Sequence, residues 1–153
     1  MAWRTAAIRA RKSTLGSWLS LAKLAKLRVQ DQKASAAVGR AGEHIALARL
    51  SLAGYVCTLC QIRGHDAYIQ TDGGVLTLQV KSASKTHGIG LRYKFHTVKK
   101  GEQRSDVYAF VAVGLDAVVF RRGDEILKTT TYVSEAEFLN ESQSMQKTLD
   151  SFK

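Results

Sequence analysis

The chain has 153 residues and a formal net charge of +10, with a pI near 9.9. That length is enough to bury a substantial core as one domain, and the ordinary apolar content excludes a disordered chain. No apolar run approaches the roughly 18 residues of a membrane span, and no secretory signal is evident. The positive charge predicts an anionic partner, with nucleic acid favoured over an anionic membrane surface or a solubility role.

Residues 1–30 are basic and lack any acidic residue, and tryptophans and leucines are interleaved with the basic positions. Three interpretations stay open: an arm that contacts nucleic acid, a transit peptide, or a packing helix with a solvated basic face. The polar run 31–35 is expected to end this segment. We therefore predict a basic helical extension over residues 1–34 and a folded domain over residues 35–153.

A helix is predicted from about Ser35 to Ala53, with Gly54 as its C-cap. At 100° per residue Glu43 falls on the apolar arc that should face the protein, between Leu47 and Leu50. A carboxylate there must be paired or must ligate something, because burying it bare is costly. Arg49 lies in the same arc, so a structural Glu43–Arg49 ion pair is the alternative to a functional role.

The two cysteines, Cys57 and Cys60, lie in a predicted strand over residues 55–62. They lack the second pair that a structural zinc site needs, and their spacing places the thiols on opposite faces of the strand. We expect two buried apolar residues in a reducing, cytoplasmic compartment.

A β-hairpin is predicted between residues 66 and 81, around the tight turn Asp72-Gly73. A two-residue loop with positive φ at both positions would pair Thr71 with Gly74 and set Asp66 opposite Gln79. Directly opposed residues share a face of the sheet, and Lys81 follows on that face. A carboxylate, an amide oxygen and an ammonium group are therefore expected to converge at one end of the hairpin. A three-residue loop would separate them.

Residues 85–105 form a basic stretch, in which the planar side chains Tyr93, Phe95 and His96 are interleaved. Such residues suit phosphate contacts and packing against bases or sugars, although the aromatic side chains could equally face the core of a solvated loop. The candidate DNA-binding residues are Lys85, Arg92, Lys94, Lys99, Lys100 and Arg104.

The rest of the chain is predicted to alternate strands and turns before a final helix. Residues 106–113 read as a buried strand, residues 117–122 as another and residues 126–133 as extended. Ser134 and Glu137 form a capping box that should begin a helix reaching towards Phe152.

The chain resembles the PD-(D/E)XK nuclease superfamily in the order of these residues: Glu43 on a helix, then Asp66, then Gln79-x-Lys81. The segments G-E-H-I-A, D-A-Y-I and L-Q-V-K-S look closest to the branch of group I intron homing endonucleases whose second motif is Q-x-K. The resemblance covers about residues 39–113. It implies an α/β, restriction-endonuclease-like core with a central mixed sheet flanked by helices. The sequence departs from the common pattern at His65, where proline is frequent, and at Gln79, which replaces an acid.

The resemblance implies an Mg²⁺-dependent endonuclease that cuts double-stranded DNA and leaves 5′-phosphate ends; Mn²⁺ would substitute. Asp66 would be the main metal ligand, with the Gln79 amide, the Val80 carbonyl and Glu43 completing the set. Lys81 would orient the attacking water and offset charge at the phosphate.

Two other functions stay open: a structure-selective nuclease similar to junction resolvases, and a nuclease-fold module that binds DNA without cutting it. Symmetric cutting takes two active sites, so a homodimer or higher homo-oligomer is expected. No membrane partner is expected.

Overall fold

The computed structural model describes residues 30–62, 64–88, 91–97 and 104–153. The chain forms two compact units, Met1–Ala37 and Val38–Lys153, and only residues 30–37 of the first are described. The interpretations of residues 1–30 therefore concern residues outside the described part, except for residue 30. In the described part, no helix is long and apolar enough to cross a membrane.

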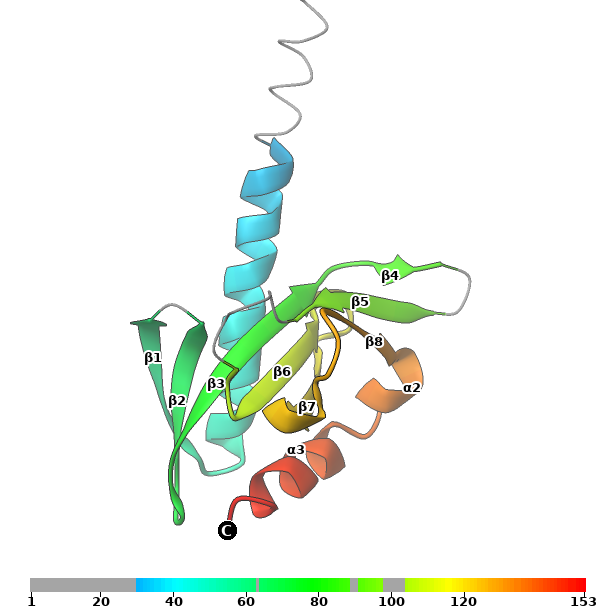
Figure 1. Ribbon diagram of the computed structural model, residues 1–153. Helices are drawn as coiled ribbons and strands as arrows, with labels where there is room; N and C mark the ends of the chain where they lie inside the picture. The colour runs from blue at the N-terminus through cyan, green and yellow to red at the C-terminus, as the bar shows by residue number, and fades with distance from the viewer. Residues whose placement is uncertain (1–29, 63, 89–90, 98–103) are drawn as a thin grey trace, which may run out of the picture. The chain divides into compact units, whose positions relative to one another are not determined.

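A five-stranded sheet forms the centre of the second unit, in the spatial order β1-β2-β3-β6-β7 (Figure 1). The strands are β1 (Val56–Ile62), β2 (His65–Thr71), β3 (Gly74–Ala83), β6 (Val107–Ala112) and β7 (Ala117–Arg122). β3 and β6 run parallel, whereas the other neighbours run antiparallel. The predicted α/β fold with a central mixed sheet flanked by helices is confirmed.

β6 lies in the middle of the core, and all of its residues are buried. Its continuous apolar run is typical of a strand that is covered on both faces. On one face Val107, Ala109 and Val111 pack against helical residues, among them Ala46, Leu50, Met145 and Leu149. On the other face Tyr108 and Phe110 pack against Tyr93, Phe95 and Val133 of a second sheet and against Phe138 of a short helix.

The helix that carries Glu43 is described from residue 30 and ends at residue 52. It closes in a Schellman motif: Gly54 has a φ of 92°, its N–H donates to the Ser51 carbonyl, and the Tyr55 N–H donates to the Leu50 carbonyl, both at 3.0 Å. The predicted C-cap is confirmed. The predicted start at Ser35 is wrong, because residues 31–35 contain neither proline nor glycine and continue the helix.

The loop between β2 and β3 has the predicted two-residue length, and Thr71 pairs with Gly74. Its backbone differs from the prediction, because the positive φ belongs to Gly74, at 129°, and not to Asp72 or Gly73. Gly73 is required for another reason: a Cβ there would lie 2.6 Å from the Phe152 carbonyl oxygen. The close approach of the C-terminal segment therefore selects glycine at this position.

The second sheet has three strands in the order β4-β5-β8. They are β4 (Thr86–His87), β5 (Arg92–His96) and β8 (Thr130–Ser134). The described part of the basic stretch 85–105 thus contains β4 and β5, and the extended segment predicted from residue 126 becomes a strand only at Thr130. Tyr93 and Phe95 are 4% and 2% exposed, so the hypothesis that they pack against bases or sugars is wrong.

Two short helices follow β8, namely α2 (Glu135–Phe138) and α3 (Glu141–Asp150). The predicted capping box is confirmed, since the Ser134 N–H and hydroxyl donate to Glu137 Oε1 at 3.0 and 3.1 Å. The single helix predicted up to Phe152 is wrong. The backbone leaves helical geometry at Asn140, which has φ −107° and ψ 35°. Asparagine is favoured at helix caps, and α3 begins at the next residue, Glu141.

α3 covers the free edge of β7, which is one end of the central sheet. The Val118 N–H donates to Glu141 Oε2 at 3.0 Å. The Phe120 N–H donates to Ser144 Oγ at 3.2 Å, and its carbonyl accepts from Thr148 Oγ1 at 3.1 Å. Side chains of α3 thus satisfy backbone groups that an uncovered edge strand would offer to another chain.

Candidate functional site

The register of the β2–β3 hairpin places Asp66 opposite Gln79. The paired residues run from Thr71 with Gly74 to Ala67 with Leu78, and the next pair in this register is Asp66 with Gln79. The two strands meet at the turn and diverge away from it (Figure 1). The predicted arrangement of these two residues therefore follows from the observed pairing.

The Asp66 carboxylate lies where the strand pairing ends. Its Oδ2 accepts a hydrogen bond of 2.6 Å from the Val80 N–H. A side-chain oxygen thus takes the place of the backbone carbonyl that a longer β2 ladder would supply to this N–H. The bond fixes the carboxylate against β3, one residue away from both Gln79 and Lys81.

Parallel pairing with β6 shows which side of the sheet each residue of β3 occupies. Gln79 and Lys81 pair with Tyr108 and Phe110, which belong to the layer under the second sheet. Val80 pairs with Ala109, which belongs to the layer under the helices. Gln79 is only 9% exposed and Lys81 is half-buried, so both side chains lie largely within this packed layer.

The helix that carries Glu43 touches β3 directly after Lys81. A Cβ on the buried Gly42 would overlap the side chain of Ser82, so only glycine permits the observed approach of helix and strand. The residue next to this contact is Glu43. Close packing at Gly42 therefore brings the helix acid near the end of the hairpin that carries Lys81.

The Glu43 carboxyl has a raised pKa, first because of its burial and second because of the Asp66 carboxylate; Arg40 and His44 oppose the shift. Glu43 and Asp66 are therefore close enough to repel each other electrostatically. Arg49 does not balance this charge. It pairs with Asp116 at 3.0 Å and with Glu141 at 2.9 Å, which excludes the Glu43–Arg49 ion pair considered from the sequence.

His65 and Ser105, which the sequence analysis did not assign to the site, hold the start of β2. Ser105 Oγ donates to the Gly64 carbonyl at 3.1 Å and lies 2.8 Å from His65 Nδ1. Because a hydroxyl has one hydrogen, His65 Nδ1 is the donor in the second bond. The two residues are 40 positions apart, so no local pattern could have indicated the contact.

Four oxygen donors of this site suit a hard divalent cation: the carboxylates of Glu43 and Asp66, the Gln79 amide and the Val80 carbonyl. The described residues contain no cluster of three or more His, Cys, Asp or Glu that could hold a metal. A metal here would therefore depend on the amide and the backbone carbonyl. The repulsion between Glu43 and Asp66 is the kind of strain that a bound cation relieves.

The predicted DNA-binding residues fall into two groups. Lys85, Arg92 and Arg104 are exposed and Lys94 is half-buried. Lys85, Arg92 and Lys94 lie on or next to β4 and β5, whereas Arg104 precedes Ser105, which contacts Gly64 and His65 at the start of β2. Lys99 and Lys100 lie outside the described residues. Three of the four described cations, Lys85, Arg92 and Lys94, thus lie on the segment that continues from the end of β3.

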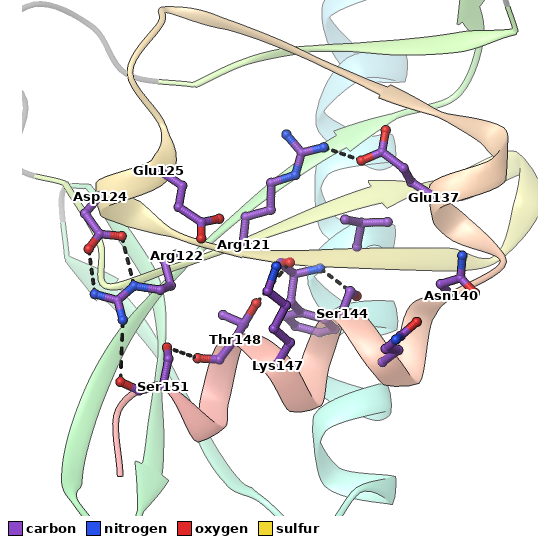
Figure 2. A pocket seen from close by; sticks show the side chains of 13 residues that line it. Arg121, Arg122, Asp124, Glu125, Glu137, Asn140, Ser144, Lys147, Thr148 and Ser151 are labelled. Atoms are coloured by element: carbon purple, nitrogen blue, oxygen red, sulfur yellow. Dashed lines mark hydrogen bonds and ion pairs between the residues drawn. The ribbon is translucent and has the colours of Figure 1, made fainter.

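A groove of about 840 Å³ lies elsewhere, between β7 and α3 (Figure 2). Its arginines are already paired, Arg121 with Glu137 and Arg122 with Asp124. None of the predicted site residues lines it. The groove follows from the way α3 packs on the sheet edge and has no link to the hairpin site.

The architecture defines a homing-endonuclease-like α/β fold. The chain is similar to a solved structure of the bacterial homing endonuclease I-Ssp6803I, with a TM-score of 0.56 and 16% identity. The similarity covers 74% of this chain and 95% of that one. No family model and no curated protein matches the chain. At this identity, the similarity establishes the fold alone.

The raised pKa of Glu43 predicts a pH-dependent effect of Glu43→Gln in metal-free buffer. A raised folded-state pKa means that the stability contributed by protonated Glu43 is lost as pH rises through that value, and glutamine avoids the loss. The variant should match wild type near pH 4 and be more stable near pH 7. Urea unfolding in EDTA measures this, with exposed Glu125→Gln as the control. A stability difference that is independent of pH would contradict the interpretation.

Proposed function

We propose that this chain is a metal-dependent endonuclease of the PD-(D/E)XK type, which hydrolyses phosphodiester bonds in double-stranded DNA. The observation that carries the proposal is the Asp66 carboxylate, held by the Val80 N–H in register with Gln79 and close to Glu43. The homing-endonuclease-like fold and the net charge of +10 support the same function.

Mg²⁺, or Mn²⁺ in its place, is the metal that the oxygen donors favour. Asp66 would use Oδ1 as a ligand, because Oδ2 is engaged with Val80. Glu43, the Gln79 amide oxygen and the Val80 carbonyl would supply the remaining protein donors. A metal held this way polarises a phosphoryl oxygen and lowers the pKa of an attacking water.

Lys81 is the group that would act on the reacting atoms without binding the metal. It follows Gln79 by two residues and so lies on the same face of β3. Its ammonium would orient the attacking water and offset the charge that develops on the phosphate. The expected products carry 5′-phosphate ends.

The DNA would lie along the basic surface beyond the end of β3, which includes Lys85, Arg92 and Lys94. Arg104 would add a contact from the segment that precedes β6. Lys99 and Lys100 are assigned to the same role from the sequence alone. Cutting both strands symmetrically takes two active sites, so the active form would be a homodimer or a higher homo-oligomer.

A module that binds DNA without cutting it is the second candidate. Gln79 favours it, because an amide brings no negative charge where a second carboxylate would hold Mg²⁺ more tightly. In this case the fold and the basic surface would bind DNA, and the hairpin site would have no catalytic function.

The proposal is tested by incubating the protein with long duplex DNA and with a four-way junction, in Mg²⁺, in Mn²⁺ and in EDTA. We expect cutting of the duplex that requires metal and gives discrete fragments. Cutting confined to the junction would identify a structure-selective nuclease. Binding without cutting in either metal would favour the non-cutting module.

A further inference from the structure

β5 presents two different faces, and the outward one is basic. Tyr93 and Phe95 are buried, and the alternate residues Arg92, Lys94 and His96 point the other way. Across from them on β8, Lys94 pairs with Tyr132 and His96 pairs with Thr130. Directly opposed residues share a face. The outer face of the second sheet is therefore formed by His87, Arg92, Lys94, His96, Thr130 and Tyr132.

The position of His87 confirms that these side chains share one surface. His87 pairs with Arg92 from the β4 side, and its ring lies 6.1 Å from the ring of Tyr132 on β8. β4 and β8 flank β5, so these rings approach each other across the central strand. They frame the cations of β5 with planar hydrogen-bonding groups.

The positive charge of this outer face favours an anionic partner. None of β4, β5 and β8 contains an acidic residue. The ion pairs among the described residues involve neither Arg92 nor Lys94. Of the acids that follow β8, Glu137 is already bonded to Ser134 and Arg121, and Glu135 takes part in none of the ion pairs among the described residues. Both cations of β5 are thus available to bind a negatively polarised surface.

The shape of the sheet favours the major groove of duplex DNA. β5 and β8 pair over five residues each, and β4 adds only two residues at one end. A two-stranded ribbon enters a major groove, which is about 12 Å wide, but not a minor groove of about 6 Å. Five residues of strand extend about 17 Å, the length of about five base pairs.

The second sheet is firmly connected to the proposed cleavage site. β3, which carries Gln79 and Lys81, ends at Ala83, and β4 begins at Thr86. The Phe95 ring packs 5.1 Å from the ring of Phe110, the residue paired with Lys81. The base pairs contacted by β5 would therefore lie at a constant distance from the phosphodiester bond that is cut.

We propose that the outer face of β5 and β8 reads base edges in the major groove, with Arg92 and Lys94 as donors to guanine. This proposal rests on the proposed DNA-nuclease function and adds to it which residues set the sequence preference. Arg and Lys are the side chains that best recognise the O6 and N7 acceptors of guanine. Lys94, which the sequence suggested as a phosphate contact, is thereby assigned to base contacts.

The test is selection of bound sequences from a randomised duplex library by the full chain in EDTA, which prevents cutting. Wild type should select a defined site. Arg92→Ala and Lys94→Ala should each relax the preference at one or two base pairs, by roughly 5- to 100-fold. Lys147→Ala on α3 removes the same charge from the other face of the central sheet and should leave the preference unchanged.

Several outcomes would overturn the proposal. If Arg92→Ala and Lys94→Ala weaken binding to all sequences equally, and lower the salt dependence by about one unit each, these residues contact phosphates only. Selection of no particular sequence by wild type would also overturn it, although DNA binding would remain. Failure of wild type to bind any DNA would instead refute the proposed function. Should Arg92→Ala not fold, Arg92→Lys keeps the charge without the bidentate fork and gives the same readout.

Discussion

Replacing Asp66 with asparagine should reduce metal-dependent DNA cleavage by roughly a thousandfold or more, while folding and DNA binding stay close to wild type. The structure makes asparagine more informative than alanine. Asp66 Oδ2 accepts a hydrogen bond from the Val80 N–H, and alanine would leave this partly buried donor without its partner. Asparagine keeps an acceptor oxygen in the same place and removes only the negative charge that would bind the metal.

A matched control for Asp66→Asn lies in the same hairpin. Asp72→Asn makes the same chemical change at the exposed turn, far along the strand from the site, and should leave cleavage intact. Cleavage and DNA binding are measured on one long duplex, and folding is followed by thermal melting. Metal-dependent cleavage that survives Asp66→Asn undiminished would remove Asp66 from the mechanism.

Gly42→Val should destabilise the fold by about 1–3 kcal/mol, the usual cost of overpacking a close contact. A Cβ at this position overlaps Ser82, so the helix must move away from β3. Because Glu43 is the next residue, cleavage should fall further than the loss of folded protein explains. Urea unfolding gives the stability, and the cleavage rate per folded molecule gives the displacement of Glu43.

The control for Gly42→Val is another glycine of the same helix. A Cβ at Gly39 meets nothing within 4 Å, so Gly39→Ala should gain about 0.5–1 kcal/mol from helix propensity alone. If Gly42→Val is as stable as wild type, the close approach of helix and strand at Ser82 is wrong. If it is destabilised but cuts normally once folded, Glu43 does not act in the site.

The geometry of the hairpin was predictable because its signals are local. The Asp72-Gly73 turn and the alternation from Val75 to Lys81 determine the register without help from the rest of the chain. The backbone of the turn was not predictable in the same way. The choice of glycine at position 73 depends on Phe152, and that contact forms only in the folded protein.

The site was predictable only in part, because several contacts that position its residues come from segments distant in the sequence. The position of Glu43 on the apolar arc agrees with its partial burial in the structure. Pairing of Arg49 with Asp116 and Glu141 could not be inferred, since Glu141 lies on a helix that was predicted with the wrong start. Contact between His65 and Ser105 likewise has no counterpart in local sequence.

The second sheet has a strand pattern that is visible in the sequence, although the segment was interpreted as a loop. Residues 92–96, R-Y-K-F-H, alternate basic and aromatic side chains with the period of a strand. The high charge and the glycines around them favoured a loop, and Tyr93 and Phe95 were considered for contact with DNA. Their burial against Phe110 and Phe138 shows that the aromatic half of the alternation builds the core.

The central claim is that Glu43, Asp66, Gln79 and Val80 hold one divalent ion together. It is tested most directly by loading the protein with Fe²⁺ in place of Mg²⁺ and adding ascorbate and peroxide, so that hydroxyl radicals cut the polypeptide nearest the metal. We predict fragments that end near residues 43, 66 and 80, which excess Mg²⁺ suppresses and which Asp66→Asn abolishes. Cuts confined to another segment, such as the acidic turn at Asp124, or no site-specific cut at all, would contradict the claim.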